Sequence, residues 1–155
     1  MSHSPLFSVK RVSWAGAYDA LRAVRTAVFI AEQRIPEALE WDEMDACCVH
    51  VLATTGANEP IGTGRLLPDG HIGRMAVLRS WRGKGVGAAL LRELIAAAME
   101  QGHAHAELSA QTYAVGFYRR FGFEVTGEEY LEVGIPHRTM QRALRPKPRS
   151  PPFRA

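Results

Sequence analysis

The chain has 155 residues, of which 46% are hydrophobic and 23% charged, and this composition suits one compact soluble domain with its own core. No apolar run is long enough to cross a membrane, and residues 1–5 lack the basic and apolar layout of a secretory signal. The formal net charge of +3 belongs to the end of the chain, because removing the four basic residues of 145–155 from 19 leaves 15, against 16 acidic residues. Neither a nucleic-acid nor a membrane partner is therefore expected.

The last residues differ in composition from the rest. Residues 145–155 contain four prolines and no acidic residue, which is typical of an extended, flexible tail. We expect a single domain over residues 1–144, followed by this tail. The only cysteines, Cys47 and Cys48, are adjacent, so they imply no disulfide framework. Because no disulfide is implied, we expect a reducing, cytoplasmic location. We also expect the protein to be a monomer or a homodimer.

The first half predicts a strand, helical material and an antiparallel meander. A strand is expected over Leu6–Ser13, and a helix from Ala17 to about Glu32, where apolar residues recur at helical spacing. Pro36 ends that pattern, and the acidic stretch that follows it is a loop or a short second helix. Asp69-Gly70 predicts a two-residue hairpin turn. The expected strands of the meander are 47–54, 61–67 and 71–78.

The second half alternates helices and strands. A broad apolar helical face begins at Val86, and Gly102 is well placed to end that helix. A short helix over Tyr113–Phe121 ends at Gly122. Strands are expected at 104–110, 123–130 and 137–144. This order predicts an α/β (α+β) fold with a mixed sheet flanked by helices.

The segment from Arg82 to Ala88 carries the clearest chemical signal. Three glycines lie between the end of a predicted strand and the start of a helix. The first amides of a helix have no internal acceptor and lie at the positive end of its dipole, and glycines let an anion approach the backbone closely. Arg82 and Lys84 add positive charge. The segment therefore predicts a pyrophosphate-binding loop.

Three classes of phosphate-binding loop compete for this segment. A P-loop requires Ser or Thr after Gly-Lys, but Gly85 follows Lys84. A dinucleotide-binding loop fits the glycine spacing from Gly83 to Ala88. However, such a loop follows its strand at once, and here residues 79–82 intervene after a strand that ends near Leu78. The third pattern is Arg-x-x-Gly-x-Gly, which Arg82, Gly85 and Gly87 match.

This third pattern resembles the coenzyme A signature of the Gcn5-related N-acetyltransferase (GNAT) superfamily. The resemblance extends over Val9–Leu144, and Phe117–Phe123 is similar to a second motif of the family, a short tyrosine-bearing helix that leads into Gly-Phe. Three segments, 25–45, 73–77 and 134–137, are similar to the ElaA/YjcF-like branch of acyltransferases. The resemblance implies a mostly antiparallel sheet of six to seven strands that splays between strands four and five.

The resemblance also implies a function. A member of this family transfers an acetyl group from acetyl-CoA directly to a primary amine of a small molecule or peptide, without a metal. Tyr118 is the expected catalytic residue, which stabilises the leaving thiolate as a hydrogen-bond donor. A backbone amide near Val77 is expected to polarise the thioester carbonyl. The alternative is a non-catalytic module that binds acyl-CoA. The expected cofactor-binding residues are Met75, Ala76, Val77, Arg82, Gly83, Lys84, Gly85, Val86, Gly87, Ala88 and Tyr118.

The acceptor side is defined less sharply by the sequence. Residues 35–64 contain no Lys or Arg, whereas Glu37–Asp45 is acidic. An acidic wall beside a basic cofactor loop predicts a cationic acceptor, with Trp41 as an aromatic face for the cation. No single general base stands out among the carboxylates and histidines. The candidate substrate-side residues are Glu40, Asp42, Asp45, His71, Arg74 and His137.

Overall fold

The computed structural model describes residues 6–145, so the predicted tail lies outside the described residues apart from Arg145. Across this range, no helix has the length and the apolar character that crossing a membrane requires. The strands are β1 (Phe7–Val12), β2 (Val49–Thr55), β3 (Pro60–Leu66), β4 (His71–Val77), β5 (His105–Gln111), β6 (Glu124–Val125), β7 (Tyr130–Glu132) and β8 (Ile135–Ala143). The α-helices are α1 (Tyr18–Arg25), α2 (Glu37–Glu40), α3 (Val86–Glu100) and α4 (Val115–Arg119).

Shorter helical turns connect these elements. A π-helical segment, Thr26–Glu32, continues α1, and 3₁₀ turns lie at Glu43–Cys47, Arg79–Trp81 and Thr112–Ala114. In the π-helical segment the amide of Gln33 donates to the carbonyl of Val28, a wider turn than that of an α-helix. The helix predicted over residues 17–32 is therefore present, with a change of pitch at Thr26.

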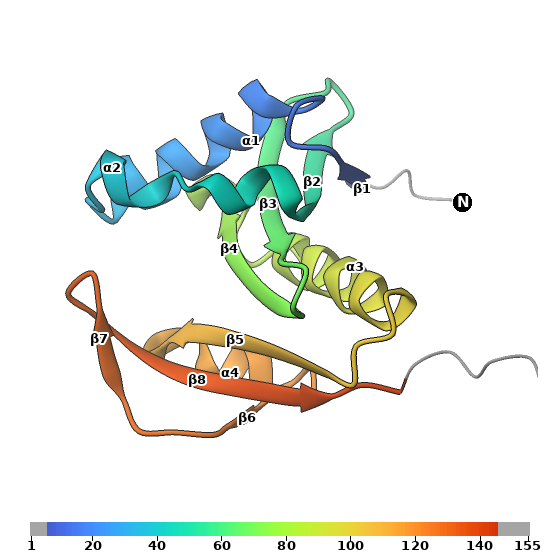
Figure 1. Cartoon of the computed structure of the whole chain (residues 1–155). Helices are drawn as coiled ribbons and strands as arrows, with labels where there is room; N and C mark the ends of the chain where they lie inside the picture. Colours follow the sequence, from blue (N-terminus) through green and yellow to red (C-terminus); the bar gives the residue numbers. More distant parts are fainter. Residues whose placement is uncertain (1–5, 146–155) are drawn as a thin grey trace, which may run out of the picture.

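All eight strands belong to one sheet, in the order β1-β2-β3-β4-β5-β8-β6, with β7 paired to β8. Every pairing is antiparallel except that of β4 with β5, which are parallel. That parallel contact has only two residue pairs, His71 with Glu107 and Ile72 with Leu108. Figure 1 shows β4 and β5 diverging from this point, which confirms the predicted splay between strands four and five.

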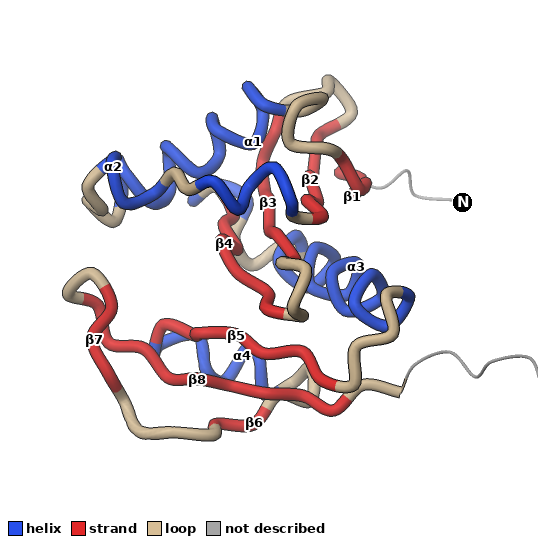
Figure 2. The backbone as a smooth tube through the Cα atoms, viewed as in Figure 1, coloured by secondary structure: helices blue, strands red, loops and turns tan. Residues whose placement is uncertain are grey.

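Helices cover both faces of the first half of the sheet (Figures 1 and 2). A side chain at Gly62 or Gly64 of β3 would meet Leu90 or Leu94 of α3. Alternate residues of β3 face the other side, where α1 packs against β3 and β4. Two buried apolar clusters result, a large one around α3 and a smaller one around Val24, Val28, Phe29 and Ala76.

Two local predictions differ from the structure. The strand expected over residues 123–130 is divided into β6 and β7, because Gly127 and two successive glutamates interrupt the β-forming residues. The hairpin at Asp69-Gly70 has a three-residue loop instead of two: the amide of Leu67 donates to the carbonyl of His71, and Gly70 has a φ of 96°.

Candidate functional site

A cleft of about 1030 Å³ opens where β4 and β5 diverge. Its walls include β4 and the start of α3 on one side, and β5, α4 and the β7–β8 hairpin on the other. Most of the candidate residues line it: Glu40, Arg74, Met75, Ala76, Val77, Arg82, Gly83, Gly85, Val86, Gly87, Ala88, Tyr118 and His137. Four candidates lie outside its lining, namely Asp42, Asp45, His71 and Lys84.

β4 carries a bulge at the point where it leaves β5. Arg65 pairs with Gly73 and Thr63 with Ala76, so two residues of β4 oppose one of β3. Arg74, one of the two, has a φ of 50°, a left-handed conformation that non-glycine residues rarely adopt. Strained residues of this kind cluster at functional sites. Here the strained backbone at the bulge directs the Arg74 side chain to the cleft.

The backbone of β4 offers an amide to the cleft. Leu78 donates its amide to the Ile61 carbonyl of β3, at 2.9 Å. Successive amides of a strand point to opposite sides, so the amide of Val77 points away from β3, toward the splay. Within residues 6–145, no pairing between β4 and β5 extends beyond Ile72. The Val77 amide therefore has the direction that the polarisation of a carbonyl group in the cleft requires.

The phosphate loop, residues 82–88, has the backbone that its glycines predict. Gly83 and Gly85 have φ values of 75° and 85°, and no heavy atom lies within 4 Å of a Cβ built at either position. Gly85 is the N-cap of the 15-residue helix α3, and no side chain caps that end. The first amides of α3 therefore remain available to an anion in the cleft.

The two basic side chains of the phosphate loop have partners inside the protein. Arg82 donates from both terminal nitrogens to the Glu32 carboxylate, at 2.6 Å each, and from Nε to the Val77 carbonyl at 3.0 Å. Hydrogen bonds from Arg82 lower the pKa of Glu32. Lys84 lies over the Trp81 ring, at 5.1 Å from its centroid. Arg82 thus fixes the loop against the end of the π-helical segment and β4, and it also lines the cleft.

Tyr118 projects from α4 into the cleft. Its ring packs edge-on against Phe117 and Phe123, at centroid distances of 5.1 and 6.1 Å. Burial raises the pKa of the Tyr118 phenol, so the group is protonated at neutral pH. No other described residue hydrogen-bonds to its hydroxyl, which leaves this donor free for a ligand.

His137 lies on β8, on the opposite wall from Arg74. Its Nδ1 lies 2.6 Å from the Ile135 carbonyl oxygen, which can only accept, so Nδ1 carries the proton. Nε2 lies 3.4 Å from the Glu132 carboxylate. The arrangement is that of a base oriented by one neighbour and supported by another.

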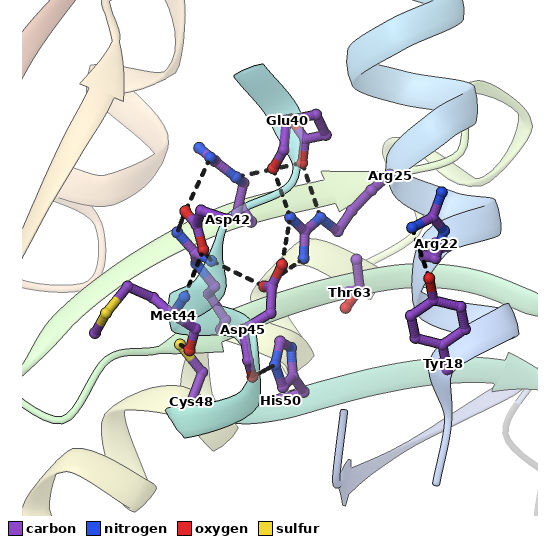
Figure 3. Close-up of polar contacts among 12 residues, drawn as sticks. Tyr18, Arg22, Arg25, Glu40, Asp42, Met44, Asp45, Cys48, His50 and Thr63 are labelled. Carbon is purple, nitrogen blue, oxygen red and sulfur yellow. Dashed lines mark hydrogen bonds and ion pairs between the residues drawn. The ribbon is translucent and has the colours of Figure 1, made fainter. Parts of the chain in front are cut away.

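The acidic stretch forms a closed ring of ion pairs with three arginines (Figure 3). Each arginine contacts two carboxylates and each carboxylate contacts two arginines. In order, the ring is Arg25, Glu40, Arg74, Asp42, Arg65 and Asp45, and back to Arg25. Arg65 lowers the pKa of Asp42 to about 2 through hydrogen bonds, whereas burial raises the pKa of Glu40. The negative charge of these three carboxylates, which was expected to attract a cationic acceptor, is balanced within this ring.

Trp41 also differs from its expected role. Its ring lies 4.1 Å from the guanidinium of Arg22 and 4.9 Å from that of Arg25, both on α1. Trp41 does not line the cleft. It therefore holds cations of the protein itself.

His71 lies at the closed end of the splay. Its two ring nitrogens face Asp69 and Glu107, the latter on β5. Burial alone would lower the pKa of His71, but the two carboxylates outweigh it and raise the pKa. His71 therefore connects β4 to β5 where the two strands pair, outside the lining of the cleft.

Several lining residues were not identified from the sequence. Gln111 at the end of β5 donates from Nε2 to Oε1 of Gln33, at 2.9 Å, across the splay. Glu132 and Val133 of the β7–β8 hairpin also line the cleft, and Val133 has a φ of 45°. Their contributions depend on contacts between distant segments, and no local pattern indicates them.

The comparisons with known proteins agree with this geometry. Residues 17–144 match the family model of the acetyltransferase (GNAT) domain. The chain is 39% identical over 123 residues to the uncharacterized N-acetyltransferase YjcF of Bacillus subtilis (strain 168), which covers 77% of this chain and 87% of YjcF. Among solved structures, an acyl-CoA N-acyltransferase from Pseudomonas aeruginosa superimposes with a TM-score of 0.78 at 31% identity, over 88% of this chain and 99% of that chain. Escherichia coli ElaA superimposes with a TM-score of 0.77 at 29% identity, over the same shares. The chain therefore belongs to the GNAT acetyltransferase family, in the branch that includes ElaA and YjcF.

Proposed function

We propose that the protein transfers an acetyl group from acetyl-CoA to a primary amine by direct attack within the cleft. The observation that supports this most strongly is the combination, in one cleft, of a free helix N-terminus, a free Val77 amide and a protonated Tyr118. The phosphate loop would hold the pyrophosphate, and the acyl chain would lie along the exposed edge of β4. A neighbour in fold, a GNAT family acetyltransferase from Elizabethkingia anophelis, has a crystal structure with acetyl-CoA bound.

Acetyl-CoA supplies the activated acetyl group, and each residue of the site has a separate task. The Val77 amide polarises the thioester carbonyl. The Tyr118 hydroxyl donates a hydrogen bond to the sulfur as the thiolate leaves. The amine must lose a proton, and we assign its acceptance to Nε2 of His137, which lies 3.4 Å from the Glu132 carboxylate. Both cysteines are free thiols, which accords with a reducing, cytoplasmic setting.

The test is release of free CoA with a panel of primary amines that includes amino acids, amino sugars, polyamines and peptides with free N-termini. We expect at least one class to raise thiol release well above the blank without amine, and mass spectrometry to find that amine acetylated. Tight binding of acetyl-CoA without turnover of any amine would instead support a non-catalytic acyl-CoA-binding module.

A further inference from the structure

The ring of ion pairs has two kinds of member. Arg25 and Arg65 are buried, with side-chain exposures of 1% and 7%, and each makes hydrogen bonds of 2.7 or 2.8 Å to two carboxylates. Arg74 is 30% exposed, and its contacts with Glu40 and Asp42 are longer, at 3.3 and 3.5 Å. The first two arginines make close contacts with their carboxylates, although the Nε of Arg65, like that of Arg74, has no hydrogen-bond partner. The contacts of Arg74 with its carboxylates are longer.

Arg74 also has unused donors. Its Nε is buried without a hydrogen-bond partner, although it faces Glu40 Oε2. Its Nη2 reaches the Leu39 carbonyl and Asp42 only at 3.5 Å, and Nη1 makes no hydrogen bond to another described residue. A buried donor that lacks a partner is costly, and a ligand that supplies acceptors removes that cost. The bulge of β4 directs this side chain to the cleft.

The charge balance of the ring is compatible with an anion at Arg74. The ring joins three arginines to three carboxylates, so its formal charges cancel. Burial raises the pKa of Glu40. Protonation of Glu40 would leave the ring with a net positive charge beside Arg74. A cationic group receives no matching excess of negative charge from the ring.

We propose that Arg74 binds a carboxylate of the acceptor, so that the amine substrate is an amino acid or a similar amine that carries a carboxylate. The proposal rests on the proposed function, because it assigns the acceptor of that reaction. A guanidinium recognises a carboxylate through a planar pair of donors, which a lysine ammonium lacks. Arg74 on β4 and His137 on β8 line opposite walls. An acceptor with its carboxylate at Arg74 would place its amine toward His137.

The experiment compares three acceptors that differ only at the carboxylate: leucine, leucinamide and 3-methylbutylamine. An apolar side chain is chosen because Phe29, Ile35 and Leu39, together with Glu40, line the cleft. With the parent protein we expect kcat/KM for leucine to exceed that for the two others by about 10- to 100-fold, the range for a charge-assisted hydrogen bond. Arg74→Gln should abolish this preference by raising KM for leucine, and Arg74→Lys should restore it only in part.

Arg22→Gln is the matched control. Arg22 lies nearby on α1, hydrogen-bonds to Tyr18 and does not line the cleft, so this variant should keep the preference for leucine. The KM for acetyl-CoA should stay unchanged in all three variants. Equal kcat/KM for leucine and leucinamide in the parent, or an equal loss for both acceptors in Arg74→Gln, would overturn the proposal.

Binding separates this proposal from the proposed function. With CoA present, leucine should raise the melting temperature of the parent more than leucinamide does, and this difference should vanish in Arg74→Gln. If Arg74→Gln folds poorly, the melting-temperature shifts with leucine and leucinamide in the parent and in Arg74→Lys test the carboxylate site instead. Binding without turnover would contradict the proposed function while supporting the carboxylate site. Turnover of other amines with no preference for a carboxylate would contradict the carboxylate site alone.

Discussion

Replacing Tyr118 by phenylalanine is expected to lower kcat by about 10²–10⁴-fold, the usual contribution of a positioned proton donor. The hydroxyl is the only group removed. Tyr118 lines the cleft, and its hydroxyl makes no hydrogen bond to another described residue. Because the ring packing against Phe117 and Phe123 is retained, the melting temperature should change little. The measurement is steady-state release of CoA with a saturating amine, together with thermal unfolding.

The pKa of Tyr118 predicts how kcat depends on pH. Burial raises the pKa of Tyr118, so the donor form persists to higher pH than for an exposed tyrosine. The parent should therefore show no loss of kcat from ionisation of this group as the pH rises toward 9. The control for Tyr118→Phe is Tyr18→Phe, which removes a hydroxyl that accepts a hydrogen bond from Arg22, away from the cleft, and should leave kcat unchanged. If kcat of Tyr118→Phe were within about threefold of the parent value, the role assigned to Tyr118 would be excluded.

Replacing Arg25 by methionine is expected to destabilise the protein by about 3–5 kcal/mol, because it removes one of the two arginine partners from each of two buried carboxylates, Glu40 and Asp45. Arg25 is 1% exposed and hydrogen-bonds to both Glu40 and Asp45. It also lies over the rings of Trp14 and Trp41, so the variant loses packing as well. Thermal unfolding should show a fall in melting temperature of about 10 °C or more.

The matched control is another arginine with two carboxylate partners. Arg11 contacts Glu93 and Glu100, but its side chain is 35% exposed. Exposed ion pairs contribute about 0–1 kcal/mol, so Arg11→Met should be nearly neutral. If Arg25→Met were as stable as Arg11→Met, the ring would not be a structural element of the fold.

The sequence predicted those parts of the fold that depend on local chemistry. The phosphate loop was found because its glycines are required by a local backbone conformation, which the φ values of Gly83 and Gly85 confirm. The order of helices and strands followed from hydrophobic periodicity in the same way. The splay of β4 from β5 came from the family resemblance, because no local pattern specifies which strands separate.

Long-range pairing explains what sequence reasoning missed. The acidic stretch looked unbalanced because no basic residue lies within it, but Arg25 and Arg65 reach Asp45 from 20 residues away on either side. Arg82 lines the cleft as a phosphate-binding residue would, and its ion-pair partner Glu32, which lies 50 residues away in the chain, was not foreseen. A survey of charge along the sequence cannot detect either contact, since the fold brings these segments together.

The central claim is that the cleft between β4 and β5 binds acetyl-CoA through the phosphate loop. Gly85→Glu places a carboxylate where the pyrophosphate would lie, and the two negatively charged groups would repel each other. The substitution also strains the backbone, because Gly85 has a φ of 85°. Gly102→Glu is the matched control: its φ is 81°, a Cβ there also meets no atom within 4 Å, and Gly102 does not line the cleft.

The most direct measurement is thermal unfolding of the parent and of both glycine variants in a titration with acetyl-CoA, with NAD as the competing ligand. A ligand at 100 times its Kd stabilises the native state by about 2.7 kcal/mol. We predict that acetyl-CoA raises the melting temperature of the parent and of Gly102→Glu by several degrees, that Gly85→Glu shows almost no rise, and that NAD has a much smaller effect. A larger shift with NAD than with acetyl-CoA, or a full acetyl-CoA shift in Gly85→Glu, would contradict the account.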